Sequence, residues 1–213
     1  MSERSAIAVS GPPFAFSDES LEEARRHLAK YPQGRQASAV LPLLHLAQRQ
    51  NGGYLTLQAL DYVADFLQMP PIRVYEVATF YTMFNLQPVG RNFVQVCTNV
   101  PCWLRGSDEV IAVFREKLGI GVGETSDDGL FTLAEGECLG ACVNAPMMQI
   151  GDDYYEDLTP ESVAAILDAL ARGEKPKAGS QIGRRGAEPA GGLTSLTAMP
   201  GAPSGPGKQG GEA

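Results

Sequence analysis

The four cysteines are the residues of this chain best suited to chemistry. They form two close pairs, Cys97-x4-Cys102 and Cys138-x3-Cys142, and no other cysteine occurs in the 213 residues. A [2Fe-2S] cluster needs four thiolates, two for each iron, so two short loops that each carry a pair suit its chemistry. We therefore predict that these four residues are metal ligands that bind one [2Fe-2S] cluster, and that the protein transfers electrons.

Three other uses of the cysteines stay open on spacing alone. Disulfide frameworks belong to short secreted chains, zinc sites usually contain C-x2-C pairs, and the thiols could also be unrelated buried groups. The neighbouring residues favour the cluster, because Gly136, Gly140 and Ala141 are small and let backbone N–H groups approach its sulfurs. Such hydrogen bonds stabilise the negative charge of a thiolate-bound cluster.

Longer stretches of the chain resemble a known family. The similarity is to the small [2Fe-2S] subunit of the NADH-oxidising module of respiratory complex I, it covers about residues 18–173, and all four cysteines fall on its ligand positions. The segments that carry it are residues 70–84, 96–106, 137–146 and 154–159, with a further match at 188–196 in the tail.

The resemblance implies a thioredoxin-like [2Fe-2S] ferredoxin domain that exchanges single electrons with a flavin. It also implies that FMN and NADH are bound by a larger partner, the flavin- and NADH-binding subunit of complex I, beside other peripheral-arm subunits. The cluster would be a side station near the flavin rather than a step on the path to quinone. Two alternatives remain: an accessory subunit of an NAD-linked hydrogenase or formate dehydrogenase, and a zinc-bound interaction module without redox function.

The rest of the sequence offers no catalytic residues. No G-x-G-x-x-G follows a predicted strand and no P-loop is found, so we expect NADH to bind elsewhere and the chain to act in catalysis only as a subunit. The two histidines, His27 and His45, fall on predicted helices far in sequence from the thiols, and neither is proposed as a ligand.

Composition and charge predict a peripheral protein without nucleic-acid binding. Apolar residues make up 44% and charged residues 20% of the chain, which permits an ordinary core. The formal net charge is -8, and phosphate binding needs a basic patch. No apolar run approaches the roughly 20 residues of a membrane-spanning helix, and the first residues resemble neither an export signal nor a transit peptide. We expect no direct membrane insertion and a position on the cytoplasmic side of a bacterial inner membrane, held there by partners.

Periodicity predicts an α+β protein with a small N-terminal helical bundle followed by the thioredoxin-like domain. The expected divisions are a flexible N-terminus at 1–16, the bundle at 17–88, the [2Fe-2S] domain at 89–173 and a low-complexity tail at 174–213. The bundle is predicted to contain four helices, over about residues 18–30, 40–51, 56–68 and 71–81.

Strands and helices alternate in the second half. Strands are predicted at 93–96, 131–134, 147–150 and 153–155, the last two joined by Gly151-Asp152, and helices at 107–118 and from Thr159 to Gly173. This order fits a thioredoxin-like layer of sheet and helices, although order alone leaves other α+β folds open.

Two segments carry open expectations. Most aromatic side chains of residues 80–84 are expected in the core, with a partner surface as the alternative. The tail at 174–213 holds ten Gly and five Pro and no aromatic residue, so on its own it should be disordered. It either gains order on a neighbouring subunit or remains a solvated linker.

Overall fold

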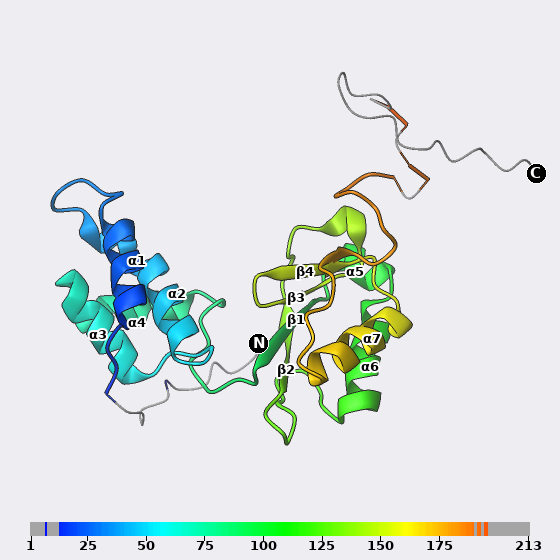
Figure 1. The fold of residues 1–213 in the computed structure, drawn as a ribbon, viewed down its shortest axis with the longest axis horizontal. Coiled ribbons are helices and arrows are strands. Elements are labelled where there is room, and N and C mark those ends of the chain that lie inside the picture. The colour runs from blue at the N-terminus through cyan, green and yellow to red at the C-terminus, as the bar shows by residue number, and fades with distance from the viewer. Residues whose placement is uncertain (1–6, 8–12, 190, 193, 196–213) are drawn as a thin grey trace, which may run out of the picture. The chain divides into compact units, whose positions relative to one another are not determined.

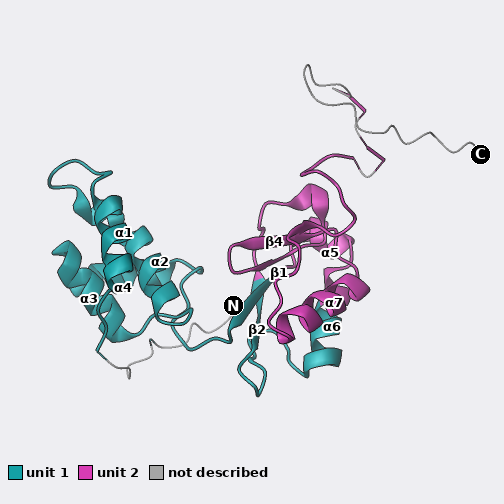
Figure 2. Cartoon of the chain, viewed as in Figure 1, with its two compact units in different colours: residues 1–96, 111–135 teal, residues 97–110, 136–213 magenta. Residues whose placement is uncertain are grey.

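The computed structural model describes residues 7, 13–189, 191–192 and 194–195 (Figure 1). Contacts divide the chain into two compact units, residues 1–96 with 111–135 and residues 97–110 with 136–213 (Figure 2). All four cysteines fall in the second unit. The division runs through two strands, so the predicted boundaries at 88 and 173 stay a proposal.

Four helices make up the first part of the chain, blue to cyan in Figure 1. They are α1 (Asp18–Leu28), α2 (Val40–Gln50), α3 (Leu57–Leu67) and α4 (Pro71–Phe80), with a 3-10 turn at Gln36–Ala39. The hydroxyls of Ser17 and Thr56 accept backbone N–H groups at the starts of α1 and α3, and Pro71 occupies the first turn of α4, where a missing N–H costs nothing. The four predicted helices are confirmed, each ending within a few residues of its expected limit.

The helices enclose an apolar core of their own. Its fully buried members include Leu43, Leu44, Leu60, Val63, Val74 and Ala78. The structure differs from the predicted flexible N-terminus at Phe14 and Phe16, which pack edge-on against Tyr62 with ring centroids 5.5 and 5.2 Å away. Aromatic burial of this kind offsets the entropy lost in ordering a short lead-in. Residues 1–6 and 8–12 lie outside the described part of the chain.

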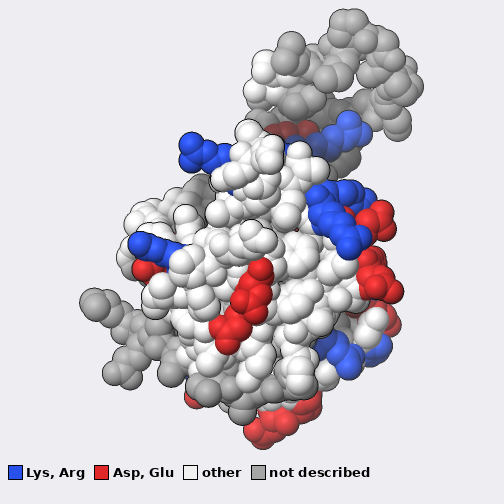
Figure 3. Space-filling view, turned by 90° about the vertical axis from the view of Figure 1, so that its left-hand side faces the viewer, with Lys and Arg blue, Asp and Glu red and all other residues white. Residues whose placement is uncertain are grey.

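The aromatic segment that follows α4 is less buried than expected. Phe84 is 5% exposed, but Phe80, Tyr81 and Met83 are 75%, 40% and 38% exposed. The core interpretation therefore holds for Phe84 and is wrong for the other three. On the face shown in Figure 3 most of the surface is uncharged, and the charged groups gather in a few small clusters, some of them with acidic and basic groups side by side.

A five-stranded sheet follows, with the order β2-β1-β3-β4-β5. Its strands are β1 (Asn92–Cys97), β2 (Phe131–Gly136), β3 (Met148–Ile150), β4 (Asp153–Glu156) and β5 (Gly179–Ser180). β3 and β4 are antiparallel with Ile150 opposite Asp153, which confirms the predicted hairpin, whereas β5 lies parallel to β4. The sheet is mixed and the α+β class is confirmed.

Three helices accompany the strands: α5 (Val100–Leu104), α6 (Ser107–Leu118) and α7 (Pro160–Ala171). Buried residues at helical spacing mark the inner faces of α6 (Val110 and Phe114) and α7 (Val163 and Ile166). The sequence predicted α6 and α7 but neither α5 nor β5. In the described part of the chain, no helix has both the length and the apolar character required to cross a membrane.

Candidate metal centre

The first cysteine pair lies where a strand turns into a short helix. β1 ends at Cys97, and Cys102 lies inside α5, whose start is fixed by the Asn99 side chain accepting the Val100 N–H at 2.8 Å and by Pro101 in the first turn. This turn brings Cys102 back to hydrogen-bond with Cys97. The two residues are only 2% and 1% exposed.

The second pair occupies the loop between β2 and β3. Gly140 has a φ of +87°, a backbone conformation that side chains with a Cβ rarely adopt, and Cys142 opens a 3-10 turn at Cys142–Asn144. The turn places the Sγ atoms of Cys138 and Cys142 3.5 Å apart. Cys138 is exposed and Cys142 half-buried.

The two pairs lie in one environment. Cys97 and Cys102 form a buried apolar cluster with Ala145 and Met147, and partly buried Leu139, Ala141 and Tyr154 pack against it. Cys142 interacts electrostatically with both Cys97 and Cys102. The structure thus brings the cysteines of each pair into contact and Cys142 within electrostatic range of the first pair. In the residues that it describes, no three or more His, Cys, Asp or Glu side chains stand close enough to hold a metal ion.

The protonation of the thiols reflects this crowding. Burial raises the pKa of Cys102 to about 12, together with its hydrogen bond to Cys97 and the negative charges of Cys97 and Cys142. The hydrogen bond with Cys138 raises the pKa of Cys142, and burial and the charge of Cys138 add to it. Thiolates this close to one another repel, so the four cannot all be deprotonated without a cation between them. A coordinated metal supplies that positive charge and deprotonates the thiols.

The donor set fits a [2Fe-2S] cluster. Two thiolates about 2.3 Å from one tetrahedral metal lie roughly 3.8 Å apart, close to the 3.5 Å between Cys138 and Cys142. The Met147 backbone N–H hydrogen-bonds Cys102 and favours its thiolate. Two paired sets of thiols, supported by a backbone donor in an apolar setting, are what two irons require.

Other residues support the loops and were missed from sequence. The Tyr154 hydroxyl donates to the Leu139 carbonyl at 2.8 Å and holds the second loop, and the Cys97 N–H donates to the Met147 carbonyl at 3.2 Å. The Asn99-x-Pro101 cap was a readable signal; the Tyr154 contact had none. His27 and His45 lie in α1 and α2, in the unit without the cysteines, as expected.

Comparison with known proteins gives consistent matches. A family model described as thioredoxin-like [2Fe-2S] ferredoxin matches residues 24–171. The chain is 60% identical over 157 residues to an NADH-quinone oxidoreductase subunit of Rickettsia bellii, a match covering 74% of this chain and 94% of the relative. It is 53% identical over 192 residues to mitochondrial NADH dehydrogenase [ubiquinone] flavoprotein 2 of Dictyostelium discoideum, covering 90% of this chain and 78% of the relative.

Among solved structures, an NAD+-reducing [NiFe]-hydrogenase in the air-oxidized state shares the fold. The TM-score is 0.56 at 21% identity, and the match covers 63% of this chain and 23% of that chain. At this identity the likeness concerns the fold alone.

Proposed function

Because this chain belongs to the thioredoxin-like [2Fe-2S] ferredoxin family, we propose that it is the electron-transfer subunit of an NADH-quinone oxidoreductase. The observation that carries this is 60% identity across 94% of a relative named as a subunit of that complex. The protein is part of an oxidoreductase complex, and its cofactor is one [2Fe-2S] cluster. The family also agrees with the predicted thioredoxin-like domain.

We further propose that the four cysteines bind the cluster, one pair for each iron. When bound, the cluster takes up and releases one electron at a time. Cys97 and Cys102 hold their thiolates in a buried apolar cluster, while the second pair lies nearer the surface, with Cys138 exposed and Cys142 half-buried. The surface pair therefore lies on the side from which an electron can arrive or leave with the least intervening protein.

We propose that the partner is a flavin- and NADH-binding subunit, within an assembly of other peripheral-arm subunits. Large apolar side chains are unusually exposed beside the cysteine loops: Val100, Trp103, Leu104 and Val143 are 61%, 57%, 69% and 65% exposed. Exposed aromatic and aliphatic groups of this kind are typical of protein interfaces. A flavin subunit that covers them would bring its flavin close to the cluster.

We propose that the assembly lies on the cytoplasmic side of a bacterial inner membrane. NADH is a polar cofactor of the cytoplasm and quinone is a lipid-soluble acceptor, so an NADH-quinone oxidoreductase has to meet both at that surface. Attachment would come from partner subunits.

The alternative assembly is an NAD-linked hydrogenase or formate dehydrogenase. The hydrogenase likeness at 21% identity shows the fold alone, whereas the relatives at 53% and 60% identity are named for NADH dehydrogenase or NADH-quinone oxidoreductase. Affinity purification of the full chain from its host distinguishes the two, through the catalytic subunit and the quinone- or hydrogen-dependent activity that accompany it.

The cluster itself is tested on the full chain purified without oxygen. We expect about two irons and two sulfides per chain and, after reduction, an electron paramagnetic resonance signal of a [2Fe-2S] centre. Cys102→Ser should lose iron and signal because a hard oxygen replaces a soft thiolate. Leu104→Ser, which places the same residue at an exposed position of α5, should retain both. Stoichiometric zinc without a signal in the unmodified protein would overturn the cluster assignment.

A further inference from the structure

A segment of the predicted disordered tail folds back onto the second cysteine loop. We call residues 179–188 the strap. It begins with β5, which pairs with β4 through Tyr155–Gly179 and Glu156–Ser180, and the Gln181 N–H then donates to the Glu156 carbonyl at 2.9 Å. Over these residues the structure differs from the expectation that the tail on its own is disordered.

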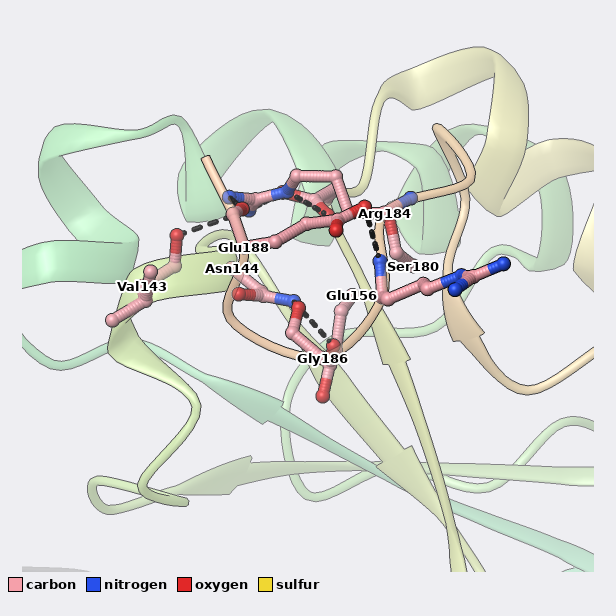
Figure 4. Close-up of polar contacts among 9 residues, drawn as sticks. Val143, Asn144, Glu156, Ser180, Arg184, Gly186 and Glu188 are labelled. Carbon is pink, nitrogen blue, oxygen red and sulfur yellow. Dashed lines mark hydrogen bonds and ion pairs between the residues drawn. The ribbon is translucent and has the colours of Figure 1, made fainter. Parts of the chain in front are cut away.

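Arg184 is the centre of the strap's contacts (Figure 4). Its guanidinium forms an ion pair with Asp157, with Nε 3.0 Å from Oδ2 and Nη2 on Oδ1. Nη1 donates to the Glu188 carbonyl at 2.9 Å, and Nη2 also donates to the Val143 carbonyl at 3.0 Å. The side chains of Arg184 and Asp157 are only 10% and 9% exposed, so this pair is largely withdrawn from solvent.

Asn144 ties the same loop to the strap a second time. Its Nδ2 donates to Glu156 Oε2 at 2.7 Å and to the Gly186 carbonyl at 2.6 Å, as Figure 4 shows. Asn144 is 3% exposed, and its own carbonyl accepts the Asp157 N–H at 2.8 Å. Val143 and Asn144 directly follow Cys142, so both strap contacts act on the backbone that carries a cysteine of the second pair.

The position of the ion pair gives it an electrostatic role as well. A [2Fe-2S] cluster held by four thiolates is anionic and gains one more negative charge on reduction, so nearby fixed charges and hydrogen bonds set its potential. A buried guanidinium favours the reduced form, and a buried carboxylate opposes it. In the Arg184–Asp157 pair the two effects largely cancel, and the removal of one partner leaves the other charge uncompensated.

We propose that Arg184, through the strap, is a positioning residue for the cluster, because it fixes the backbone of the Cys138–Cys142 loop. Together with Asp157 it also sets the reduction potential of the cluster, since the two charges shift that potential in opposite directions. This inference rests on the proposed function, since it requires the cluster. It assigns to a residue of the tail a role in electron transfer that neither the cysteine motif nor the fold requires.

The test measures the midpoint potential of the cluster by redox titration of the electron paramagnetic resonance signal in the full chain. Arg184→Ala should shift the midpoint to more negative values, because Asp157 is left unpaired. Asp157→Asn should shift it to more positive values, because Arg184 is left unpaired. The double variant should return close to the unmodified potential. A loop that is only loosened, with no electrostatic effect, would not give shifts of opposite sign.

Two further variants complete the design. Arg185→Ala removes the same charge from an adjacent, exposed side chain and should leave the midpoint unchanged. Arg184→Lys retains the charge without the forked contacts, so its midpoint should stay near the unmodified value while protease cleavage within residues 179–188 of the cluster-free protein becomes several-fold faster. That second readout needs no bound cluster and remains available if Arg184→Ala fails to load one.

Equal midpoints in all variants, or shifts of the same sign in Arg184→Ala and Asp157→Asn, would overturn the positioning role. Unchanged protease cleavage in Arg184→Lys and Arg184→Ala would overturn the mechanical part. Failure of the unmodified chain to show iron, sulfide and signal is a different result, which refutes the proposed function instead.

Discussion

The two cysteine loops reach the same site by different means. Cys97 and Cys102 are 2% and 1% exposed and are held by a local device, the strand end of β1 and the Asn99 cap of α5. Cys138 and Cys142 are exposed and half-buried, and their loop is held from distant positions by Tyr154 and Arg184. The first loop therefore has a helix cap of its own beside its contacts with Met147, whereas the second loop is held by side chains from other elements of the chain.

Replacement of the ligands should reveal this difference most strongly. Cys102→Ser should abolish cluster binding, because a hard serine oxygen replaces a soft thiolate at a position that is only 1% exposed and so closed to a substitute ligand from solvent. Cys138→Ser should leave partly loaded protein with an altered signal, since solvent can reach that position. Iron and sulfide content with the resonance spectrum measures both. If both variants lose iron, sulfide and signal to the same extent, the two loops do not differ in the way proposed.

Thiol reactivity in the cluster-free protein should follow the same division. Cys102 should react with iodoacetamide at pH 8 at least about tenfold more slowly than Cys138, because it is buried and its pKa is raised to about 12, while the thiolate is the reactive form. Mass spectrometry of timed samples gives the rate at each site. Matching rates at Cys97, Cys102 and Cys138 would show that the first loop opens as readily as the second.

Acid should loosen the strap that supports the second loop. Burial raises the pKa of Asp157, but hydrogen bonds from Arg184 and Ser180 and the positive charges of Arg184 and Arg105 outweigh it, so the pKa lies below the ordinary 3.8. A carboxylate whose pKa is lowered by folding stabilises the fold fully at a pH above its pKa in the unfolded chain, about 3.8. This stabilisation is lost as the pH falls from there through the lower pKa of the folded protein.

Protease cleavage within the strap of the cluster-free protein, measured from pH 7 to pH 3 with an acid-tolerant protease, checks this. Cleavage should accelerate at the acid end in the unmodified chain. In Asp157→Asn it should already be fast at pH 7 and show less dependence on pH. A pH dependence of cleavage identical in the two proteins would assign the acid response to other groups.

The smallest effect is expected from a single hydrogen bond. Tyr154→Phe removes the hydroxyl that donates to Leu139 and should lower the free energy of unfolding by about 1 kcal/mol. Tyr54→Phe is the control, since among the described residues its hydroxyl has no hydrogen-bond partner, and it should change little. Denaturant unfolding of the cluster-free proteins measures both. If the control lowers the free energy of unfolding as much as Tyr154→Phe does, the Tyr154 hydroxyl has no special part in holding the second loop.

Sequence reasoning found the parts of the site that are encoded locally. The cysteine spacing located all four thiols, and apolar periodicity located α1 to α4, α6 and α7. It missed α5, although Asn99 and Pro101 are a recognisable start, because five residues are too few to show a helical period. The ligand role of the cysteines remains a proposal.

The strap was beyond sequence reasoning for a physical reason. The Gly- and Pro-rich composition of the whole tail at 174–213 predicts disorder, and the strap itself holds three Gly in ten residues. The contacts that order the strap join residues far apart, since Arg184 is 27 positions from Asp157 and 41 from Val143. Asp157 also has a φ of +53°, a conformation that is uncommon for residues other than Gly and that the sequence did not announce. The family-like segment 188–196 lies further along the tail, and its residues 190, 193 and 196 are outside the described part of the chain. That this segment docks on a partner stays a proposal.

During protein synthesis the second cysteine loop is made before the strap that supports it. Val143 leaves the ribosome 41 residues ahead of Arg184, which at common translation rates corresponds to roughly 2 to 8 s. During that interval the buried pair of thiols can already fold, while the surface pair still lacks its outer support.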